Sequence, residues 1–334
     1  MSKLFYINLA VILFLIGYFY RKFAIKKNIK DIPSERSSHQ IPVVRGGGII
    51  FFSAILFFGI YELYRYGFNA KFLAFFIGFL LLGILGFTDD LKELTPKQRF
   101  PFQLISILLI LYASGLYEAD MPVWVKLLAI IVSLGFVNAY NFMDGINGIT
   151  GFYSIIVVIT YWYLNAIYHL LPDYLFPLLF ISLMVFGFFN YRKNALMFAG
   201  DIGSMSLAAV ILFILTKYMV ELKSPVLILT VLLYGVDSAM TIILRFFNKE
   251  NVFKAHRWHV YQKMVDVYHF SHLKTSFLYA ITQAFINGLL IHYALYQKNL
   301  KFQVILLGIV LLIFVILYLL IQREKLFKIV KSNK

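Results

Sequence analysis

Residues 304–321 read VILLGIVLLIFVILYLLI, an apolar run that contains no charged residue and no proline. A helix of about 20 mostly apolar residues is long enough to cross the hydrocarbon core of a bilayer. A strand of a membrane barrel would alternate apolar and polar residues, and this run does not alternate. Because backbone groups in lipid must form their hydrogen bonds within their own segment, the run predicts a membrane-spanning helix.

Ten further apolar runs, each bounded by charged residues, Pro or Gly, repeat this pattern along the chain. Together the eleven predicted spans cover approximately 4–20, 48–66, 71–87, 100–116, 122–141, 148–165, 174–190, 203–219, 225–246, 274–296 and 300–321. We therefore predict an all-α, polytopic integral membrane protein of about 10–11 transmembrane helices, with a single membrane domain over residues 1–334.

The composition agrees with this fold class. Apolar residues make up 61% of the chain and charged residues 14%, whereas soluble proteins have roughly 45–50% and about 25%. These values exclude a water-soluble enzyme, a disordered chain and a secreted scaffold. The chain has no cysteine, which also excludes disulfides and thiolate metal sites.

Lys and Arg are distributed unevenly between the loops. When the loops are assigned alternately to the two faces, 23 of the 31 basic residues fall on one face and 8 on the other. Positive residues favour the cytosolic face, so we expect an outer N-terminus. The net charge of +15 then anchors the cytosolic loops near anionic membrane lipid, and no nucleic-acid partner is expected. The predicted cytosolic loops are about 21–47, 88–99, 141–148, 191–202 and 245–274.

Polar residues and glycines concentrate at the predicted cytosolic face. Chance placement would distribute them over both faces, and a scaffold or channel does not need acids, amides and histidines on one face. We therefore interpret this face as a site of chemistry. The five clusters are residues 37–48, 88–99, 138–151, 198–204 and 255–263.

The first two clusters place glycines or paired acids next to a predicted helix. Gly46–Gly48 precede the second span, where backbone N–H groups could approach an anion closely; the alternative is a flexible start to the helix. Asp89 and Asp90 follow the third span, and adjacent carboxylates repel each other unless a cation or proton lies between them. The pair predicts a Mg²⁺ or proton-transfer site, with helix capping by solvated charges as the alternative.

The next two clusters lie at the junctions of apolar helices. Asn138 and Asn141 are three residues apart and are expected to share a face of the last turn of the fifth span. Polar groups at that depth usually line a cavity, and the Asp-Gly and Asn-Gly dipeptides that follow predict a tight turn. Asp201 opens the eighth span and fits either a helix N-cap or a metal ligand at the membrane surface.

The fifth cluster contains two histidines with basic neighbours. His256 and His259 would share a helix face beside Arg257 and Lys263. Zinc would require further Cys, His or carboxylate ligands, so we interpret the group as a phosphate or diphosphate clamp, with surface histidines as the alternative. The five clusters together are suited to phosphoryl transfer between a soluble and a lipid-borne substrate.

Two rival classes stay open on the residues alone. A proton-coupled carrier would use a polar residue within the membrane, and Asp237 in the ninth span is a candidate. Transporters usually show related halves and a site near the midplane, and the sequence shows no internal repeat. A noncatalytic scaffold would tolerate substitution in all five clusters.

The order of the clusters resembles that of the polyprenyl-phosphate N-acetylhexosamine-1-phosphate transferase superfamily, from about residue 37 to 263. The stretch Asn141-Phe-Met-Asp144-Gly-Ile-Asn147-Gly resembles the superfamily's NxxDGxDG signature. The other matching motifs are the paired acids Asp89-Asp90, Gly200-Asp201-Ile-Gly203-Ser204 for GDxGS, and His256-Arg-Trp-His259 for the cytosolic His motif.

The resemblance implies a Mg²⁺-dependent transferase, with Mn²⁺ as an alternative ion. Undecaprenyl phosphate would attack the β-phosphorus of a UDP-N-acetylhexosamine, carrying GlcNAc or a related 6-deoxy sugar, and release UMP. Either a one-step attack or a phospho-aspartate route is compatible with it. The product would initiate synthesis of a cell-envelope polysaccharide at a bacterial plasma membrane, and a homodimer is compatible with this assignment.

The resemblance also implies roles for individual residues. Asp201 would hold the metal on the diphosphate with support from Asp90, and Asp89 would act as base or as partner of the lipid phosphate. Asn141 and Asp144 would bind the nucleotide. The implied catalytic residues are Asp89, Asp90, Asp144, His256 and His259. The implied substrate-binding residues are His39, Arg45, Asn138, Asn141, Asn147 and Arg257.

The chain departs from the family pattern at two motifs. Asn147 stands where the family often has a second Asp, which removes a charge and keeps hydrogen-bonding capacity. The His motif lacks a contiguous His triplet, which points away from the phospho-muramoyl-pentapeptide transferase, the alternative within the family, and towards the sugar-only enzymes. No luminal insertion typical of the eukaryotic dolichol enzyme is visible, so we expect a bacterial source.

Overall fold

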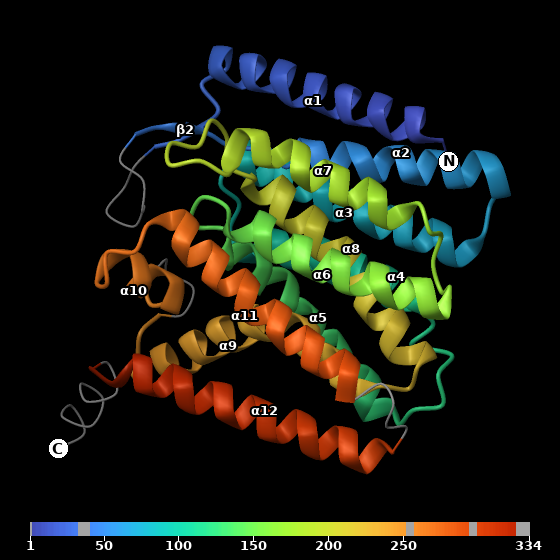
Figure 1. Cartoon of the computed structure of the whole chain (residues 1–334), viewed down its shortest axis with the longest axis vertical. Helices are drawn as coiled ribbons and strands as arrows, with labels where there is room; N and C mark the ends of the chain where they lie inside the picture. The colour runs from blue at the N-terminus through green and yellow to red at the C-terminus, as the bar shows by residue number, and fades with distance from the viewer. Residues whose placement is uncertain (1, 33–40, 252–256, 294–298, 325–334) are drawn as a thin grey trace.

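The computed structural model describes residues 2–32, 41–251, 257–293 and 299–324. Within these residues the chain forms twelve α-helices, one 3-10 helix and a two-stranded antiparallel sheet (Figure 1). In chain order the elements are α1 (Lys3–Lys26), β1 (Lys30–Asp31), β2 (Val43–Val44), α2 (Ile49–Tyr66), α3 (Ala70–Leu91), α4 (Pro96–Ser114), α5 (Val123–Met143), α6 (Ile149–Tyr168), α7 (Leu175–Asn190), α8 (Gly200–Glu221), η1 (Pro225–Val231), α9 (Leu232–Phe247), α10 (Val260–Asp266), α11 (His272–Tyr293) and α12 (Leu300–Ile321).

Each predicted span overlaps helical structure in the described chain, so the all-α membrane fold is confirmed. Eight helices of the described chain are long and apolar enough to cross a membrane, when η1 and α9 are counted as one. α7 is apolar but has only 16 residues. α11 carries several polar side chains along its length, and its Gln283 and Asn287 are turned into the bundle and buried. Such residues lower the hydropathy of a helix without exposing polar groups to lipid.

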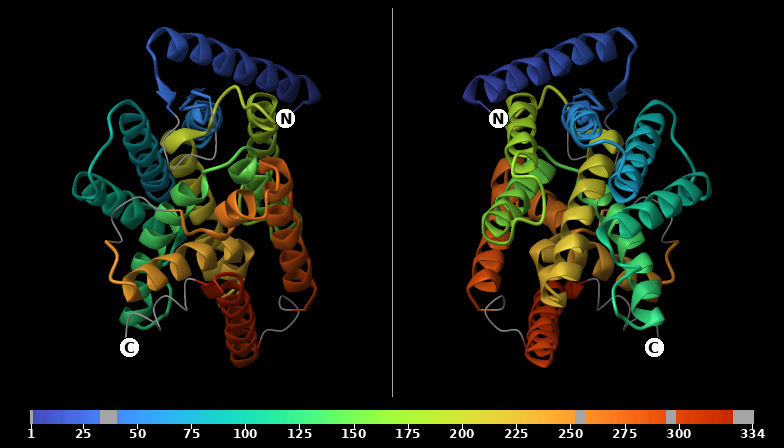
Figure 2. Two further views of the ribbon diagram at one scale, coloured as in Figure 1. Left: turned by 90° about the vertical axis from the view of Figure 1, so that its left-hand side faces the viewer. Right: turned by 90° about the vertical axis from the view of Figure 1, so that its right-hand side faces the viewer.

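The helices at the centre and at the edge of the bundle differ in burial. α3 and α8 pack against each other in the middle, whereas α1 and α12 lie along opposite sides (Figures 1 and 2). The apolar stretch of α8 is 83% buried and that of α12 only 6%. α8 is therefore the central helix, and α12 presents its side chains to the surrounding lipid.

Glycine allows α3 and α8 to approach backbone to backbone. A Cβ added at Gly86 of α3 would lie 2.4 Å from the backbone oxygen of Asp201, at the start of α8. Small residues permit such close contact between membrane helices. The contact brings the end of α3 to the beginning of α8, where both carry acidic residues.

The ninth predicted span is broken rather than continuous. Its first seven residues form η1, and α9 begins at Leu232. The break disturbs backbone hydrogen bonds that lipid cannot replace. The side chain of Gln283 bonds one backbone group on each side of it. Its Nε2 donates to the oxygen of Leu229 at 2.9 Å, and its Oε1 accepts from the N–H of Leu233 at 3.1 Å. Gln283 thus stabilises the break from the neighbouring helix α11.

Replacing Gln283 by Leu is expected to destabilise the protein. Each buried backbone group left without a partner costs about 1–3 kcal/mol. The variant leaves the Leu233 N–H without its partner and removes one of the two donors to the Leu229 oxygen, which keeps the N–H of Leu232. Tyr153→Phe is the matched comparison, because it removes only the hydroxyl that donates to Gln283 at 2.9 Å. Thermal unfolding in detergent should show a clearly larger loss for Gln283→Leu, and equal losses would contradict this role.

The two ends of the bundle are distinct. β1, β2 and α10 lie at one end, and the N-terminus and the α2–α3 connection lie at the other (Figure 1). We call the first the sheet end. The ends of α3 and α5 and the beginnings of α2 and α8 also lie there, so the sheet end gathers the predicted polar clusters.

Candidate active site

Asp90 joins two motifs that are far apart in the sequence. It lies in the last turn of α3 and is only 8% exposed. Its carboxylate accepts hydrogen bonds from the backbone N–H groups of Asp201 at 2.9 Å and Ile202 at 3.1 Å. These N–H groups belong to the first turn of α8, where helical backbone donors lack intrahelical partners and favour negative charge. Asp90 therefore fixes the start of α8 against the end of α3.

The close approach of Asp90 requires glycine at position 200. Gly200 has a φ of +71°, and a Cβ there would lie 2.5 Å from the Asp90 carboxylate. A residue with a side chain would meet both a backbone strain and a clash. The glycine of the GDxGS-like motif thus makes room for the acidic pair of α3.

Arg45 lies between two of the acids. Its Nε is 3.2 Å from Asp90, and its guanidinium is 3.6 Å from Asp201. The loop that carries it is held by Tyr20, whose hydroxyl donates to the Arg45 backbone oxygen at 2.9 Å. Gly47 fixes the loop further, because its N–H donates to the backbone oxygen of Phe198 at 2.8 Å. The guanidinium group of Arg45 therefore lies between the carboxylates of Asp90 and Asp201.

Asp89 is held separately from Asp90. It is 4% exposed, accepts a hydrogen bond from the N–H of Leu94 at 2.6 Å, and forms an ion pair with Arg99 at 3.0 Å. The charge of Asp89 also acts on the carboxyl group of Asp201, as does that of Asp90. The alternative of solvated capping charges is wrong for both acids of α3, because both are buried and bonded.

Asp201 lies in the first turn of α8, and the N-cap position is occupied by Ala199. The N-cap alternative for Asp201 is therefore wrong. Its Oδ1 accepts a hydrogen bond from the side-chain amide of Asn141 at 2.7 Å, and the same amide donates to Ser204 at 3.1 Å. The NxxDGxDG-like and GDxGS-like motifs thus meet directly, through their first polar residues.

Asp144 completes the group from the turn between α5 and α6. It is partly buried, and the Thr150 hydroxyl donates to it at 2.6 Å. Burial raises the pKa of Asp144 from 3.8 to about 6, with the nearby Asp90 charge adding to the effect and the Thr150 bond opposing it. The carboxyl is therefore ionised at neutral pH at a cost to stability.

Asp144→Asn is expected to stabilise the substrate-free protein at neutral pH. A raised pKa means that this carboxyl favours folding most below pH 4, and that the contribution is lost as the pH rises through about 6. A shift from 3.8 to about 6 corresponds to at most about 3 kcal/mol, and solvent screening of this partly exposed group lowers that figure. Asn is neutral at every pH and still accepts the Thr150 bond. In EDTA without donor, the melting temperature of the variant should exceed that of wild type at pH 7.5, and the difference should shrink towards pH 4; a constant difference would contradict the assignment.

Two predicted asparagines bind other parts of the fold. Asn138 exchanges hydrogen bonds with Gln103 of α4, at 3.3 and 3.4 Å, and does not contact the acids. It therefore does not act on the same neighbours as Asn141, although the two are three residues apart. Asn147 is buried and donates to the backbone oxygens of Arg192 and Lys193, both at 2.9 Å. The structure places Asn147 where it holds the α7–α8 connection.

The described part of the histidine cluster lies beside α9. His259 is the N-cap of α10 and has extended backbone, so it does not lie within a helix. Its Nδ1 is 3.2 Å from the buried Asp237, which also accepts from the N–H of Val260 at 3.1 Å. Arg257 pairs with Asp266 at 2.5 Å. His39 and His256 lie outside the described residues.

Three positioning residues could not be recognised from the sequence. Arg99 lies ten residues after Asp89, Tyr20 lies in a lipid-facing helix, and Tyr279 donates to Asp237 at 2.7 Å from α11. Arg99 ends the 88–99 cluster, but the other two belong to no motif, and no spacing rule links any of the three to its partner. The sequence indicates Asp237 only as the candidate membrane residue of a proton-coupled carrier.

Within the described ranges, no three His, Cys, Asp or Glu side chains are arranged as a protein-only metal cage. Mg²⁺ does not require one, since it keeps several waters and usually binds one or two carboxylates together with substrate phosphates. Asp201 and Asp89, with the Asn141 amide beside them, are hard oxygen donors of this kind. The donor set therefore fits Mg²⁺.

Comparisons with known proteins agree with this geometry. Residues 72–219 match the model of glycosyl transferase family 4, and this range contains the α3 acids, Asn141, Asp144 and Asp201. The chain is 27% identical to the probable undecaprenyl-phosphate N-acetylglucosaminyl 1-phosphate transferase of Bacillus subtilis, over 73% of this chain and 72% of the relative. It is 28% identical to the phospho-N-acetylmuramoyl-pentapeptide-transferase of Thermotoga neapolitana, over 64% of this chain and 73% of the relative. The family match and the two relatives support the resemblance to the polyprenyl-phosphate N-acetylhexosamine-1-phosphate transferase superfamily that the motifs indicate.

Proposed function

We propose that this enzyme transfers an N-acetylhexosamine 1-phosphate from a UDP-N-acetylhexosamine to undecaprenyl phosphate. The products are undecaprenyl-diphospho-N-acetylhexosamine and UMP. The observation that carries the proposal is the convergence of Asp89, Asp90 and Asp201 with Arg45 at the sheet end of the bundle. Acids and a cation packed this closely at a helix terminus are suited to binding and transferring phosphoryl groups.

The reaction exchanges one phosphoanhydride bond for another. An oxygen of the lipid phosphate forms a bond to the β-phosphorus of the donor, and the bond from that phosphorus to the bridging oxygen of UMP breaks. Both substrates are anionic, so the carboxylates of the site need positive charge between them and the phosphates. Mg²⁺, or Mn²⁺, would be held by Asp201 and would supply that charge, also for the oxygen that leaves with UMP.

The residues of the chain divide the remaining work. Asp89, held by Arg99 and the Leu94 N–H, is placed to receive a proton from the lipid phosphate or to orient it. Asp90 supports the site indirectly, because its oxygens are engaged by α8 and Arg45. Arg45 is 30% exposed in its side chain and can contact the acceptor phosphate from its position beside Asp90.

The donor nucleotide is assigned to the α5–α6 side of the site. Asn141 contacts Asp201 from there at 2.7 Å, and Asp144 lies at the end of α5. His259 lies beyond Phe142, with ring centroids 6.5 Å apart, and is placed for the sugar or the distal phosphate. The site is proposed to face the cytosol of a bacterial plasma membrane, which agrees with the distribution of Lys and Arg over the loops.

A second candidate is the phospho-N-acetylmuramoyl-pentapeptide reaction, because a relative of similar identity carries that name. The His256-Arg257-Trp258-His259 motif, which lacks a contiguous His triplet, favours the sugar-only donor. The two candidates share the acidic site and differ only in what occupies the donor side.

A donor panel tests the proposal. Purified protein receives undecaprenyl phosphate, Mg²⁺ and one of four donors: UDP-GlcNAc, its C4 epimer, a 6-deoxy UDP-HexNAc or UDP-MurNAc-pentapeptide. We expect lipid-dependent UMP release with at least one simple HexNAc donor, and no comparable release with the pentapeptide donor. Turnover of the pentapeptide donor alone would establish the second candidate. If no donor gives UMP release, the protein is better interpreted as a carrier or a scaffold.

A further inference from the structure

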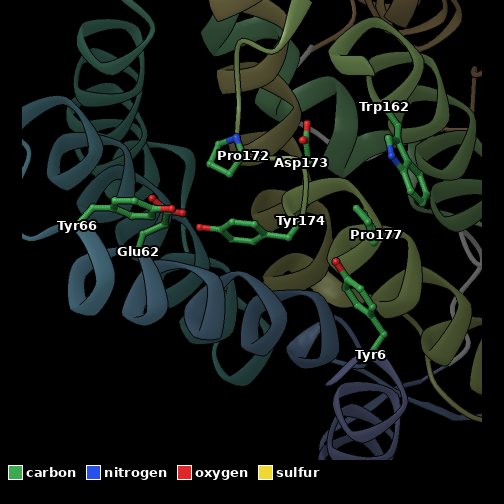
Figure 3. A pocket seen from close by; sticks show the side chains of 8 residues that line it. All are labelled: Tyr6, Glu62, Tyr66, Trp162, Pro172, Asp173, Tyr174 and Pro177. Carbon is green, nitrogen blue, oxygen red and sulfur yellow. The ribbon is translucent and has the colours of Figure 1, made fainter. Parts of the chain in front are cut away.

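A second cavity lies at the end of the bundle opposite the acidic site. It has a volume of about 720 Å³ and opens between the ends of α1, α2, α6 and α7 (Figure 3). Glu62 of α2 lies 14 residues after Gly48, which corresponds to about 21 Å along a helix. The cavity is therefore separate from the site of phosphoryl transfer. Its lining residues are Tyr6, Glu62, Tyr66, Trp162, Pro172, Asp173, Tyr174 and Pro177.

Two buried oxygen atoms in this cavity have no hydrogen-bond partner among the described residues. They are Oε1 of Glu62 and the hydroxyl of Tyr174. Figure 3 shows the Tyr174 hydroxyl directed towards Glu62 and Tyr66. The Tyr174 ring is fixed by edge contact with Tyr61, with ring centroids 5.5 Å apart. Buried polar atoms are nearly always paired with protein, water or a ligand, so these two atoms require a partner from outside the described chain.

The charge and walls of the cavity define the chemistry of that ligand. Glu62 and Asp173 contribute carboxylates, and no lining residue is Lys or Arg. Asp173 is 76% exposed in its side chain and forms the rim, whereas the shielded oxygen of Glu62 lies inside. An unpaired carboxylate oxygen away from water is unfavourable unless a cation meets it. The preferred occupant is therefore positively charged.

The aromatic lining favours an organic cation over a metal ion. Tyr6, Tyr66, Trp162 and Tyr174 make up half of the eight lining residues. Ammonium groups bind over the faces of such rings, and no three metal-ligating side chains come together in the described chain. We propose that the Glu62 cavity binds an ammonium group, which donates hydrogen bonds to Glu62 and to the oxygen of Tyr174. The cation comes either from an amine-bearing lipid headgroup or from a small soluble amine.

Binding is tested by thermal unfolding of the purified full-length protein in detergent. Short-chain phosphatidylethanolamine is titrated in parallel with phosphatidylglycerol of the same chains, which lacks the amine. A second arm compares ethanolamine hydrochloride with sodium chloride at equal ionic strength, and a third uses a neutral methyl glycoside. We expect the amine lipid to raise the melting temperature more than its amine-free counterpart. A rise with ethanolamine at a similar concentration would instead identify a soluble amine as the source.

Substitutions connect the effect to the cavity. Glu62→Gln should raise the half-saturating amine concentration about tenfold, the size expected for loss of one charge-assisted hydrogen bond. Tyr174→Phe should raise it by a smaller factor, and this variant keeps the test valid should Glu62→Gln fail to fold. Asp120→Asn is the matched control, an exposed acid at the same end that does not line the cavity.

Three results would overturn the proposal. They are equal stabilisation by the two lipids without an ethanolamine effect, unchanged amine binding in Glu62→Gln and Tyr174→Phe, and binding of the neutral glycoside in place of the amines. Because the readout is stability and not transfer, the outcome is independent of the proposed reaction.

Discussion

Asp201→Asn and Asp89→Asn are each expected to lower lipid-dependent UMP release by about 10²–10⁴-fold. Asn keeps the shape of Asp201 and its contact with Asn141, which approaches at 2.7 Å. It removes the charge that a metal ion requires, and at position 89 it removes the proton acceptor. The loss should appear in kcat, because both groups act on the reacting phosphates.

The same variants must be shown to fold. Both variants should elute in detergent as wild type does. Asp201→Asn relieves repulsion between crowded carboxylates and should keep its melting temperature, whereas Asp89→Asn loses the ion pair with Arg99 and should unfold at a lower temperature. Asp120→Asn, at the opposite end of the bundle, should retain full turnover. Normal turnover in Asp201→Asn or Asp89→Asn would contradict the site assignment.

Gly86→Ala should lower both stability and turnover. Its new Cβ would lie 2.4 Å from the backbone oxygen of Asp201 and 2.7 Å from the N–H nitrogen of Ile202, and neither backbone atom can rotate away. Helices α3 and α8 must separate, at a cost of about 1–3 kcal/mol. The separation moves Asp89 and Asp90 away from Asp201, and a shift of about 1 Å in reacting groups can reduce turnover about 10²-fold.

Gly235→Ala provides the matched control. Gly235 is also within a helix, but a Cβ there has no atom within 4 Å. Replacing a helical Gly by Ala contributes up to about 1 kcal/mol of helix propensity. We expect unchanged turnover and an equal or higher melting temperature. If Gly86→Ala behaves like Gly235→Ala, the close contact of α3 and α8 does not position the acids.

The sequence was sufficient to predict the membrane fold and much of the acidic site. Apolar runs of about 20 residues have few structural alternatives in lipid, and every predicted span is helical. The unusual residue types at helix ends identified Asp89, Asp90, Asn141 and Asp201, which the structure brings together. These predictions needed only local pattern and the rule that polar groups near a membrane require partners.

Tertiary partners could not be predicted in the same way. Asp90 and the N–H of Asp201 are 111 residues apart in the chain, and no periodicity specifies their contact. Asn138 and Asn141 look equivalent in the sequence, yet only Asn141 faces α8. The break before α9 and its stabilisation by Gln283 could not be predicted either, because an apolar run does not indicate where a helical hydrogen bond is missing.

The fate of the β-phosphorus tests the proposed reaction most directly. Purified protein is given undecaprenyl phosphate, Mg²⁺ and UDP-GlcNAc, or the donor that the panel selects, labelled at the β-phosphate. The account predicts that the label moves to the lipid and that unlabelled UMP is released in equal amount. Label that stays in released UDP would mean transfer of the sugar alone, and would contradict the proposed transfer of a sugar 1-phosphate.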